Sequence, residues 1–226
     1  MRTVYRICNI MQRTVLRLFA DWRVSGGQNV PPMGPLIVVA NHQSNIDPPL
    51  LGASLPRDLF FLAKETAFGN PAARWLLNNY GAYPLKRGKI DIAAIRWALN
   101  KLSGDNAIVL FPEGTRSPGK MKKALSGVTL LAIKSGAPIL PVGITGTEKL
   151  GPILRVAFPT GNIRVNVGQV FSLPVVHGKL EKPQLDSMTS IIMDRIAALL
   201  PESYHGVYGK FTKPTNTRSS IGEYKN

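Results

Sequence analysis

Two short polar segments contain the residue types that acid–base chemistry and phosphate binding use. They are Asn41-His42-Gln43-Ser44-Asn45-Ile46-Asp47-Pro48 and Phe111-Pro112-Glu113-Gly114-Thr115-Arg116-Ser117. Each begins where a compact apolar run ends, at residues 36–40 and 107–111. Short apolar runs that are rich in branched residues and bounded by turn formers are typical of buried strands. If both strands lie parallel in one sheet, the two segments meet at its carboxyl edge, where open α/β sheets place their ligands.

His42 and Asp47 are candidates for a general base and the carboxylate that orients it. A carboxylate beside an imidazole fixes the tautomer and stabilises the cation that forms when the ring takes a proton. On one continuous helix the two side chains would lie about 140° apart, so the pair requires a loop between them. A structural interpretation stays open, because aspartate before proline commonly caps a helix and a lone histidine is usually a satisfied turn or core residue.

Arg116 is a candidate for binding a phosphate group. The planar guanidinium can donate two parallel hydrogen bonds to phosphate, and Gly114 supplies a bend beside it. Pro112 and Gly114 would equally suit any junction of a strand with a turn. Lys64, Lys86 and Arg87 each follow a predicted strand, which places them at the same edge, although basic residues on loops are often only solvated.

The rest of the chain predicts strands that alternate with helices. Strands are expected at residues 36–40, 59–63, 82–85, 107–111, 139–144 and 163–167. Helices are expected at residues 48–55, 72–80, 90–102, 130–134 and 188–200. This alternation predicts a single α/β domain, residues 25–208, with a largely parallel central sheet flanked by helices. Residues 209–226, rich in Lys, Thr, Ser and Asn, are expected to form a disordered basic tail.

Residues 1–24 are expected to form an amphipathic helix. Apolar residues recur every three or four positions along one stripe: Val4, Cys8, Met11, Val15, Leu18 and Trp22. Roughly opposite them lie Arg2, Arg6, Arg13 and Arg17. This pattern suits a helix that lies on a membrane surface, so a peripheral location on the cytoplasmic face is expected. The alternatives are a stripe docked on the body of the protein and an organellar transit sequence.

The charge balance predicts an anionic partner. The 226 residues include 28 Lys and Arg against 13 Asp and Glu, which gives a net charge of +15. Nucleic acid, lipid headgroups and a phosphorylated substrate would all suit that charge. A nucleic-acid-binding module would need basic residues interleaved with aromatic ones, or a docking motif, and neither is evident. The three histidines lie far apart in the sequence and lack ligand spacing, so no metal site is predicted.

Taken together, the two segments resemble the paired signatures of the glycerolipid acyltransferase family, whose best-known members acylate lysophosphatidic acid. The segment Gly81-Ala82-Tyr83-Pro84-Leu85-Lys86-Arg87 is similar to the family's second block, in which a basic residue contacts phosphate. The strand Leu140-Pro141-Val142-Gly143-Ile144 is similar to the fourth block, which lines the acyl site. The resemblance covers about residues 30–200. This chain departs from the family pattern at Pro84 and in the spacing of residues 122–127.

The resemblance implies an O-acyltransferase that moves a fatty acyl group from an acyl thioester to the free hydroxyl of a lysophosphatidic acid, giving phosphatidic acid. In that reaction His42 would remove the hydroxyl proton and Asp47 would orient His42. The implied acceptor-binding residues are Glu113, Gly114, Thr115 and Arg116, together with Arg87 and Lys64. Cys8 lies outside the motifs, whereas Ser44 is close enough to His42 in the sequence to keep an acyl-enzyme route open.

The implied partners are a phospholipid membrane surface, a lysophospholipid acceptor and a thioester of coenzyme A or acyl carrier protein. The thioester is a co-substrate, and no further cofactor and no nucleic acid are expected. Glycerol 3-phosphate and other lysolipids are alternative acceptors, because each presents a hydroxyl near a phosphate. A lipid-binding scaffold without catalysis is a further alternative, which the complete set of motif residues disfavours.

Overall fold

The computed structural model describes residues 2–86, 91–150, 157–174, 178 and 181–208. The strands are β1 (Ala20–Ser25), β2 (Leu36–Ala40), β3 (Leu59–Lys64), β4 (Ala82–Leu85), β5 (Ala107–Leu110), β6 (Ile139–Thr145) and β7 (Gly161–Val167). The α-helices are α1 (Arg2–Phe19), α2 (Asp47–Ser54), α3 (Pro71–Tyr80), α4 (Ile92–Ser103), α5 (Gly127–Ser135) and α7 (Lys182–Ala197). The predicted tail at residues 209–226 lies outside the described residues.

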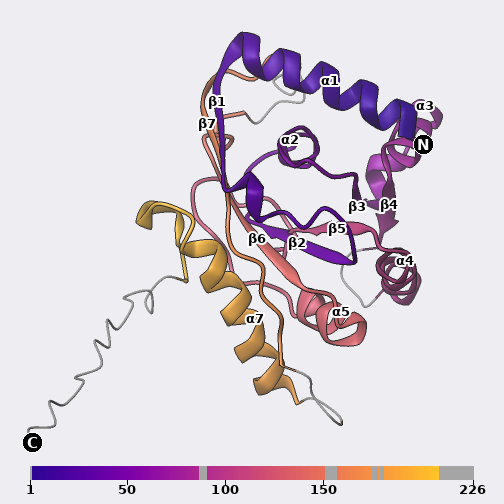
Figure 1. Cartoon of the computed structure of the whole chain (residues 1–226), viewed down its shortest axis with the longest axis vertical. Coiled ribbons are helices and arrows are strands. Elements are labelled where there is room, and N and C mark those ends of the chain that lie inside the picture. The colour runs from indigo at the N-terminus through magenta and orange to yellow at the C-terminus, as the bar shows by residue number, and fades with distance from the viewer. Residues whose placement is uncertain (1, 87–90, 151–156, 175–177, 179–180, 209–226) are drawn as a thin grey trace, which may run out of the picture.

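Within the described residues, seven strands form one sheet in the order β1-β7-β6-β2-β5-β3-β4 (Figure 1). The five strands from β6 to β4 run parallel to one another. β7 is antiparallel to β6, and β1 is parallel to β7. The predicted α/β domain with a largely parallel sheet is therefore confirmed.

Helices cover both faces of the sheet, and the central strands are apolar on both sides. Leu36, Val38 and Ala40 of β2 belong to a core beneath α1, α2 and α3. Ile37 and Val39 belong to a second core beneath α4, α5 and α7. Successive side chains of a strand point to opposite faces, so a strand that is buried on both sides reads as a continuous apolar run. That is why this strand was recognisable in the sequence.

Local sequence sets the boundaries of α3 and delivers β4. The side-chain oxygen of Asn70 accepts the Ala73 N–H at 2.7 Å and caps the helix, and Pro71 follows in the first turn. Gly81 ends the helix in the left-handed region, at a φ of 90° that side chains with a Cβ rarely adopt. The chain then enters β4 directly, so Lys86 follows at the carboxyl edge of the sheet.

The amino-terminal helix is shorter than the predicted 1–24. α1 ends at Phe19, and residues 20–25 form strand β1, in which Trp22 pairs with Ile163 of β7. The four-residue step from Leu18 to Trp22 fits a helical stripe, but the sequence of this short segment does not reveal that its partner strand lies 141 residues away. α5 and α7 also begin earlier than predicted, at Gly127 and Lys182.

α1 packs on α2 and α3 through a side of the helix other than the predicted stripe. The buried residues of α1 are Tyr5, Asn9, Gln12 and Leu16. In contrast, Met11 and Leu18 of the stripe are 62% and 71% exposed. The stripe is therefore divided: Met11 and Leu18 face solvent, whereas Val4, Cys8 and Val15 are half-buried and Cys8 packs against the core. Among the described helices, none combines the length and the apolar character needed to cross a bilayer.

Polar contacts fasten α1 to the domain. The Tyr5 hydroxyl accepts the Leu59 N–H at 3.1 Å, and the Tyr80 hydroxyl donates to the Asn9 side chain at 2.8 Å. Gly52 of α2 lies directly below, where a Cβ would stand 2.4 Å from the Tyr80 hydroxyl oxygen. A side chain at this position would displace the Tyr80 hydroxyl and the Asn9 amide from the places in which they hydrogen-bond each other.

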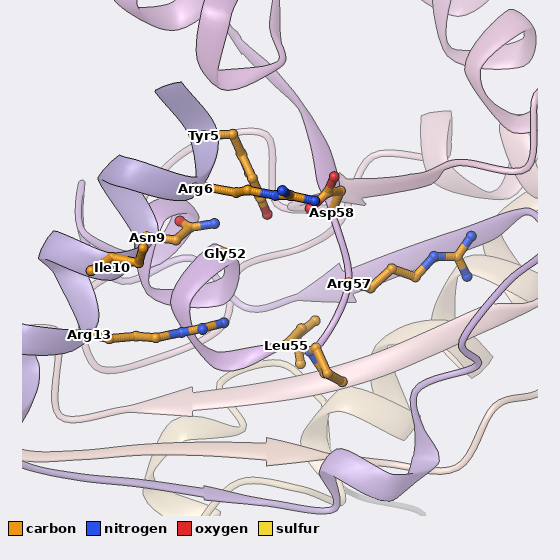
Figure 2. A pocket seen from close by; sticks show the side chains of 10 residues that line it. Tyr5, Arg6, Asn9, Ile10, Arg13, Gly52, Leu55, Arg57 and Asp58 are labelled. Atoms are coloured by element: carbon orange, nitrogen blue, oxygen red, sulfur yellow. The ribbon is translucent and has the colours of Figure 1, made fainter. Parts of the chain in front are cut away.

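A hollow of about 450 Å³ lies between α1 and the connection from α2 to β3. Figure 2 shows Arg6 and Arg13 reaching into it from α1, whereas Arg57 is directed away from that helix. Arg13 donates to the Ala53 carbonyl at 2.7 Å, and Arg57 donates to carbonyls of three loop residues, Pro31, Gly34 and Asp105. Arg13 and Arg57 therefore stabilise the end of a helix and a set of loops. The predicted site residues do not line this hollow.

Candidate active site

The two sequence motifs lie side by side at the carboxyl edge of the sheet. β2 and β5 are neighbouring parallel strands, with Val39 paired to Leu110, so the segments that follow them leave the sheet together. The side chain of Asn41 continues the sheet by one step, because its amide accepts the Ile144 N–H at 2.7 Å and donates to the Ile144 carbonyl at 2.8 Å. The loop that carries His42 is thereby tied to β6 as well as to β5.

His42 and Asp47 form the predicted pair. The His42 Nδ1 atom lies 2.8 Å from Asp47 Oδ2, although Asp47 is the first residue of α2 and His42 lies in the loop before it. The same oxygen accepts the N–H groups of Gln43 and Ser44 at 2.6 and 2.7 Å. The carboxylate is fully buried and has lost its hydrating water. The three donors compensate for that loss by hydrogen-bonding the charge.

Asp47 is not the helix cap that the sequence also allowed. The N-cap position of α2 is Ile46, which has no capping side chain. The Asp47 carboxylate instead turns back to the loop and binds the N–H groups that precede the helix. The loop between His42 and Asp47 is therefore closed around the carboxylate, which brings together two side chains that a continuous helix would separate.

The His42 ring is held in one orientation. It stacks on Phe111 with ring centroids 4.1 Å apart and 23° between the planes. With Nδ1–H donated to Asp47, the neutral ring carries its lone pair on Nε2, and no described residue hydrogen-bonds that atom. The His42 side chain is 13% exposed, which leaves the ring accessible at one edge. This arrangement suits a general base that acts through Nε2.

Glu113 joins the second motif to the first. Its Oε1 atom accepts the His42 N–H at 3.0 Å and its Oε2 atom accepts the Lys122 N–H at 2.7 Å. The His42 carbonyl accepts the Ser117 N–H at 2.7 Å, which is a further link between the loops. The described contacts of Glu113 are thus with backbone groups, so its side chain supports the loops on either side of the site.

Gly114 has a conformational reason to be glycine. Its φ is 66°, and a Cβ would stand 2.7 Å from a methyl carbon of Leu125. The bend carries the chain to Thr115 and Arg116, both of which are exposed. No described residue forms an ion pair or a side-chain hydrogen bond with the Arg116 guanidinium, so its donors are available for a ligand.

The other predicted basic residues lie at the same edge of the sheet. Lys64 ends β3, the neighbour of β5, and Lys86 follows β4, the next strand outward. Both side chains are exposed, and the Lys86 N–H donates to Asp91 at 2.9 Å. Arg87 lies outside the described residues. Among the described residues, no group of three or more His, Cys, Asp or Glu side chains could hold a metal ion.

Ser44 lies near His42 in the sequence but has a different partner. Its hydroxyl donates to the Leu150 carbonyl at 2.6 Å, and the residue is 2% exposed. The side chain therefore links the first motif to the loop that follows β6. A nucleophile activated by His42 would instead have to hydrogen-bond the ring.

Thr147 is a site residue that the sequence motifs did not indicate. Its hydroxyl donates to Asp47 Oδ1 at 2.8 Å, and it is fully buried. The only signal in the sequence was its position, because it follows the predicted strand 139–144 and therefore lies at the same edge as the two motifs.

An α/β sheet with a histidine–aspartate pair and an exposed arginine at its carboxyl edge combines a general base with a group that can bind an anion. The sequence model of the Acyltransferase family matches residues 21–145, more than half of the chain, so the protein belongs to the acyltransferase family.

Individual relatives agree with this assignment. A chloroplastic 1-acyl-sn-glycerol-3-phosphate acyltransferase of Brassica napus is 29% identical over 80% of this chain and 50% of its own length. A lyso-ornithine lipid O-acyltransferase of Pseudomonas aeruginosa is 36% identical over 54% of this chain and 46% of its own. The crystal structure of the 1-acyl-sn-glycerophosphate acyltransferase of Thermotoga maritima superposes with a TM-score of 0.68 and 29% identity, covering 86% of this chain and 78% of that one. This chain thus spans about half the length of the two curated relatives.

Proposed function

We propose that this protein transfers a fatty acyl group from an acyl thioester to the free hydroxyl of a lysophosphatidic acid, giving phosphatidic acid. The observation that carries the proposal is the 2.8 Å contact of His42 with buried Asp47, in a loop joined to the one that presents Arg116. The names of the Brassica napus and Thermotoga maritima relatives support this acceptor.

The chemistry that we propose needs one proton carrier. An acyl thioester is already activated, so the missing component is a nucleophile. His42 Nε2 takes the proton of the acceptor hydroxyl as its oxygen attacks the thioester carbonyl carbon. When the carbon–sulfur bond breaks, the leaving thiolate takes that proton from the imidazolium. Asp47 stabilises the imidazolium between these steps through Nδ1–H.

The phosphate group places the hydroxyl. The Arg116 guanidinium has no partner among the described residues, and the next residue, Ser117, donates its N–H to the His42 carbonyl. We therefore expect a phosphate bound to Arg116 to lie close to the base. Lys64 ends the strand beside β5 and adds positive charge at that edge. Holding the acceptor by its phosphate converts a bimolecular encounter into an oriented one.

Product identification tests the proposal. The purified full chain is offered lysophosphatidic acid, glycerol 3-phosphate, other lysophospholipids and a lyso-ornithine lipid, each with an acyl-CoA and an acyl carrier protein donor. We expect phosphatidic acid as the main product, and the two donor series identify the thioester. Acylation of a different acceptor in preference to lysophosphatidic acid would overturn the acceptor assignment while keeping the family chemistry.

A lyso-ornithine lipid is the second candidate acceptor. The relative named after that substrate has the higher identity of the two curated relatives, 36% against 29%, although over a shorter stretch. The acceptor panel separates the two candidates directly.

Ser44 provides a test of the route. If the acceptor hydroxyl attacks the thioester directly, Ser44→Ala should retain kcat within about tenfold, because only the bond to the Leu150 carbonyl is lost. Steady-state kinetics should show intersecting double-reciprocal lines. Parallel lines, or an acyl group found on Ser44 by mass spectrometry, would establish an acyl-enzyme instead.

We propose in addition that α1 lies on the surface of the membrane that holds the lipid acceptor. Its solvent-exposed side carries the apolar residues Ile7, Ile10, Met11, Leu18 and Phe19. Arg6 and Arg17 are exposed along the border of that side. Apolar side chains flanked by arginines are typical of helices at an anionic interface.

The exposed apolar surface extends to the catalytic edge of the sheet. Phe19 contacts Phe158, which is 58% exposed, with ring centroids 5.4 Å apart. β1 starts directly after Phe19 and runs opposite to β2, so this end of α1 lies at the edge where His42 emerges. A bilayer that contacts this surface would meet the protein on the side of the acceptor site. Because Tyr5, Asn9 and Leu16 are buried in the domain, we propose a permanent helix over a removable transit sequence.

The membrane contact predicts a specific loss of vesicle binding. The double variant Met11→Ser, Leu18→Ser should bind anionic vesicles several-fold more weakly, because both side chains are exposed and apolar. Binding of the parent should also weaken as salt rises, since charge is screened over about 10 Å at 0.1 M. Activity on detergent-dispersed acceptor should survive.

The matched control is Met33→Ser, Ile191→Ser, which removes exposed apolar side chains from other elements. Equal vesicle binding by the two double variants, measured by sedimentation, would place the membrane contact elsewhere.

A further inference from the structure

The turn at residues 147–150 contacts the loop that holds the base at two points, Ser44 and Asp47. The Thr147 hydroxyl donates to Asp47 Oδ1 at 2.8 Å, and the Leu150 carbonyl accepts the Ser44 hydroxyl at 2.6 Å. The Leu150 N–H donates to the Thr147 carbonyl at 3.0 Å and closes the turn. All four residues are at most 2% exposed. The turn is therefore packed against the His42–Asp47 loop through direct, buried hydrogen bonds.

Thr147 completes the hydrogen bonding of the catalytic carboxylate. The Oδ2 atom of Asp47 has three donors: His42, Gln43 and Ser44. The Oδ1 atom has one described donor, the Thr147 hydroxyl. Without that donor, the carboxylate would be held through Oδ2 alone, and no described hydrogen bond at Oδ1 would oppose its rotation about the Cβ–Cγ bond. The direction of the Nδ1–H bond, and with it the direction of Nε2, depends on this rotation.

We propose that Thr147 is a positioning residue for the reaction, acting on the base through Asp47. This inference rests on the proposed function of His42. It concerns a part of the chain, residues 146–150, that lies beyond the matched family region at residues 21–145.

The turn is also held by contacts of Glu148 that do not involve Thr147. Glu148 accepts the Gly146 N–H at 3.0 Å. The Tyr204 hydroxyl hydrogen-bonds the Glu148 side chain. Its pKa is raised, mainly by burial and secondly by this hydrogen bond. The backbone of Tyr204 in turn accepts the Met121 N–H at 2.9 Å, in the loop after Arg116. With the Ser44 bond, these contacts keep the turn in place when the Thr147 hydroxyl is removed.

The test compares Thr147→Val with Thr147→Ser in the full chain. Valine keeps the shape and removes the donor, whereas serine keeps the donor. We expect Thr147→Val to lower kcat by about 10- to 100-fold, the effect of misplacing a catalytic group by up to an ångström, with the acceptor KM changed less than threefold. Thr147→Ser should restore kcat to within about threefold of the parent.

The matched control is Thr145→Val, the same change at the end of β6, where the hydroxyl has no hydrogen-bond partner among the described residues. It should leave kcat unchanged. All assays are run well below the unfolding temperature of each variant, so that a loss of stability does not count as a loss of turnover. An unchanged kcat in Thr147→Val, or an equal loss in Thr147→Ser, would overturn the proposal.

A second measurement does not depend on the substrate. The ring nitrogens of His42 are observed by NMR in the labelled full chain, and the His42→Ala spectrum assigns them among the three histidines. The parent should show the neutral tautomer with the proton on Nδ1, and Thr147→Val should show a mixture of the two tautomers. If no acceptor of the panel is turned over, the proposed function fails, but this spectrum still tests the role of Thr147. Identical ring-nitrogen shifts in the parent and in Thr147→Val would contradict it.

Discussion

Replacing His42 by alanine is expected to lower kcat for acyl transfer by about 10²–10⁴, the usual contribution of a general base. The acceptor KM should change little, because the phosphate contacts remain. The fold should survive, since the ring packs on Phe111 at the edge of the site and is partly exposed. Steady-state kinetics with a saturating donor, together with a thermal unfolding curve, measure both quantities.

Two further observations separate the loss of a base from general damage. Added imidazole should restore part of the activity of His42→Ala, because a small base can occupy the space that the ring leaves. Asp47→Asn should also be impaired, because a neutral amide stabilises the imidazolium less than a carboxylate does, even when its oxygen keeps the donors that now bind Oδ2. If His42→Ala turned over within a few-fold of the parent, His42 would be removed from the mechanism.

Replacing Arg116 by alanine is expected to raise the acceptor KM by roughly 10- to 100-fold, with a much smaller effect on the donor KM. A hydrogen bond to a charged group contributes about 1.5–3 kcal/mol, which corresponds to that range. The guanidinium makes no described side-chain contact within the protein, so the loss should come from the ligand and not from the fold. Initial rates against each substrate, with the other held constant, provide the measurement.

Arg116→Lys should recover little of the loss, because an ammonium group cannot reproduce a planar fork with two donors. The control is Lys120→Ala, which removes an exposed cation from the same loop. Its acceptor KM should stay within a few-fold of the parent. An unchanged acceptor KM in both Arg116 variants would show that another group binds the phosphate, and Lys64 would then be the next residue to test.

The strands that carry the site could be predicted from sequence because their signal is local. Residues 36–40 and 107–110 are buried on both faces of the sheet, so they appear as short continuous apolar runs that end at polar turns. The alternation with helices then implied parallel strands and a common carboxyl edge. From that edge, the proximity of His42, Asp47 and the Arg116 loop followed, and the structure has this arrangement.

The roles of individual polar side chains were decided by tertiary contacts. The sequence was equally consistent with Asp47 as a helix cap. Only the structure shows that its buried carboxylate accepts the N–H groups of the loop before α2. Glu113 was expected in the acceptor site, whereas its carboxylate binds backbone N–H groups of residues 71 and 9 positions away. A hydrogen bond between distant segments leaves no periodicity and no compositional bias in either segment, so a local sequence pattern does not predict it.

Contacts between distant segments also explain three features that the sequence did not predict: the strand at residues 20–25, the docking side of α1 and the role of Thr147. Residues 20–25 form a strand because β7 offers a partner edge, which the segment itself does not encode. α1 docks through Tyr5, Asn9 and Leu16, and two of these residues form hydrogen bonds with Leu59 of β3 and Tyr80 of α3, contacts that the local sequence does not reveal. Thr147 reaches Asp47 across 100 residues of sequence. Periodicity determined which segments become strands and helices, whereas pairing between distant segments decided which side chains complete the site.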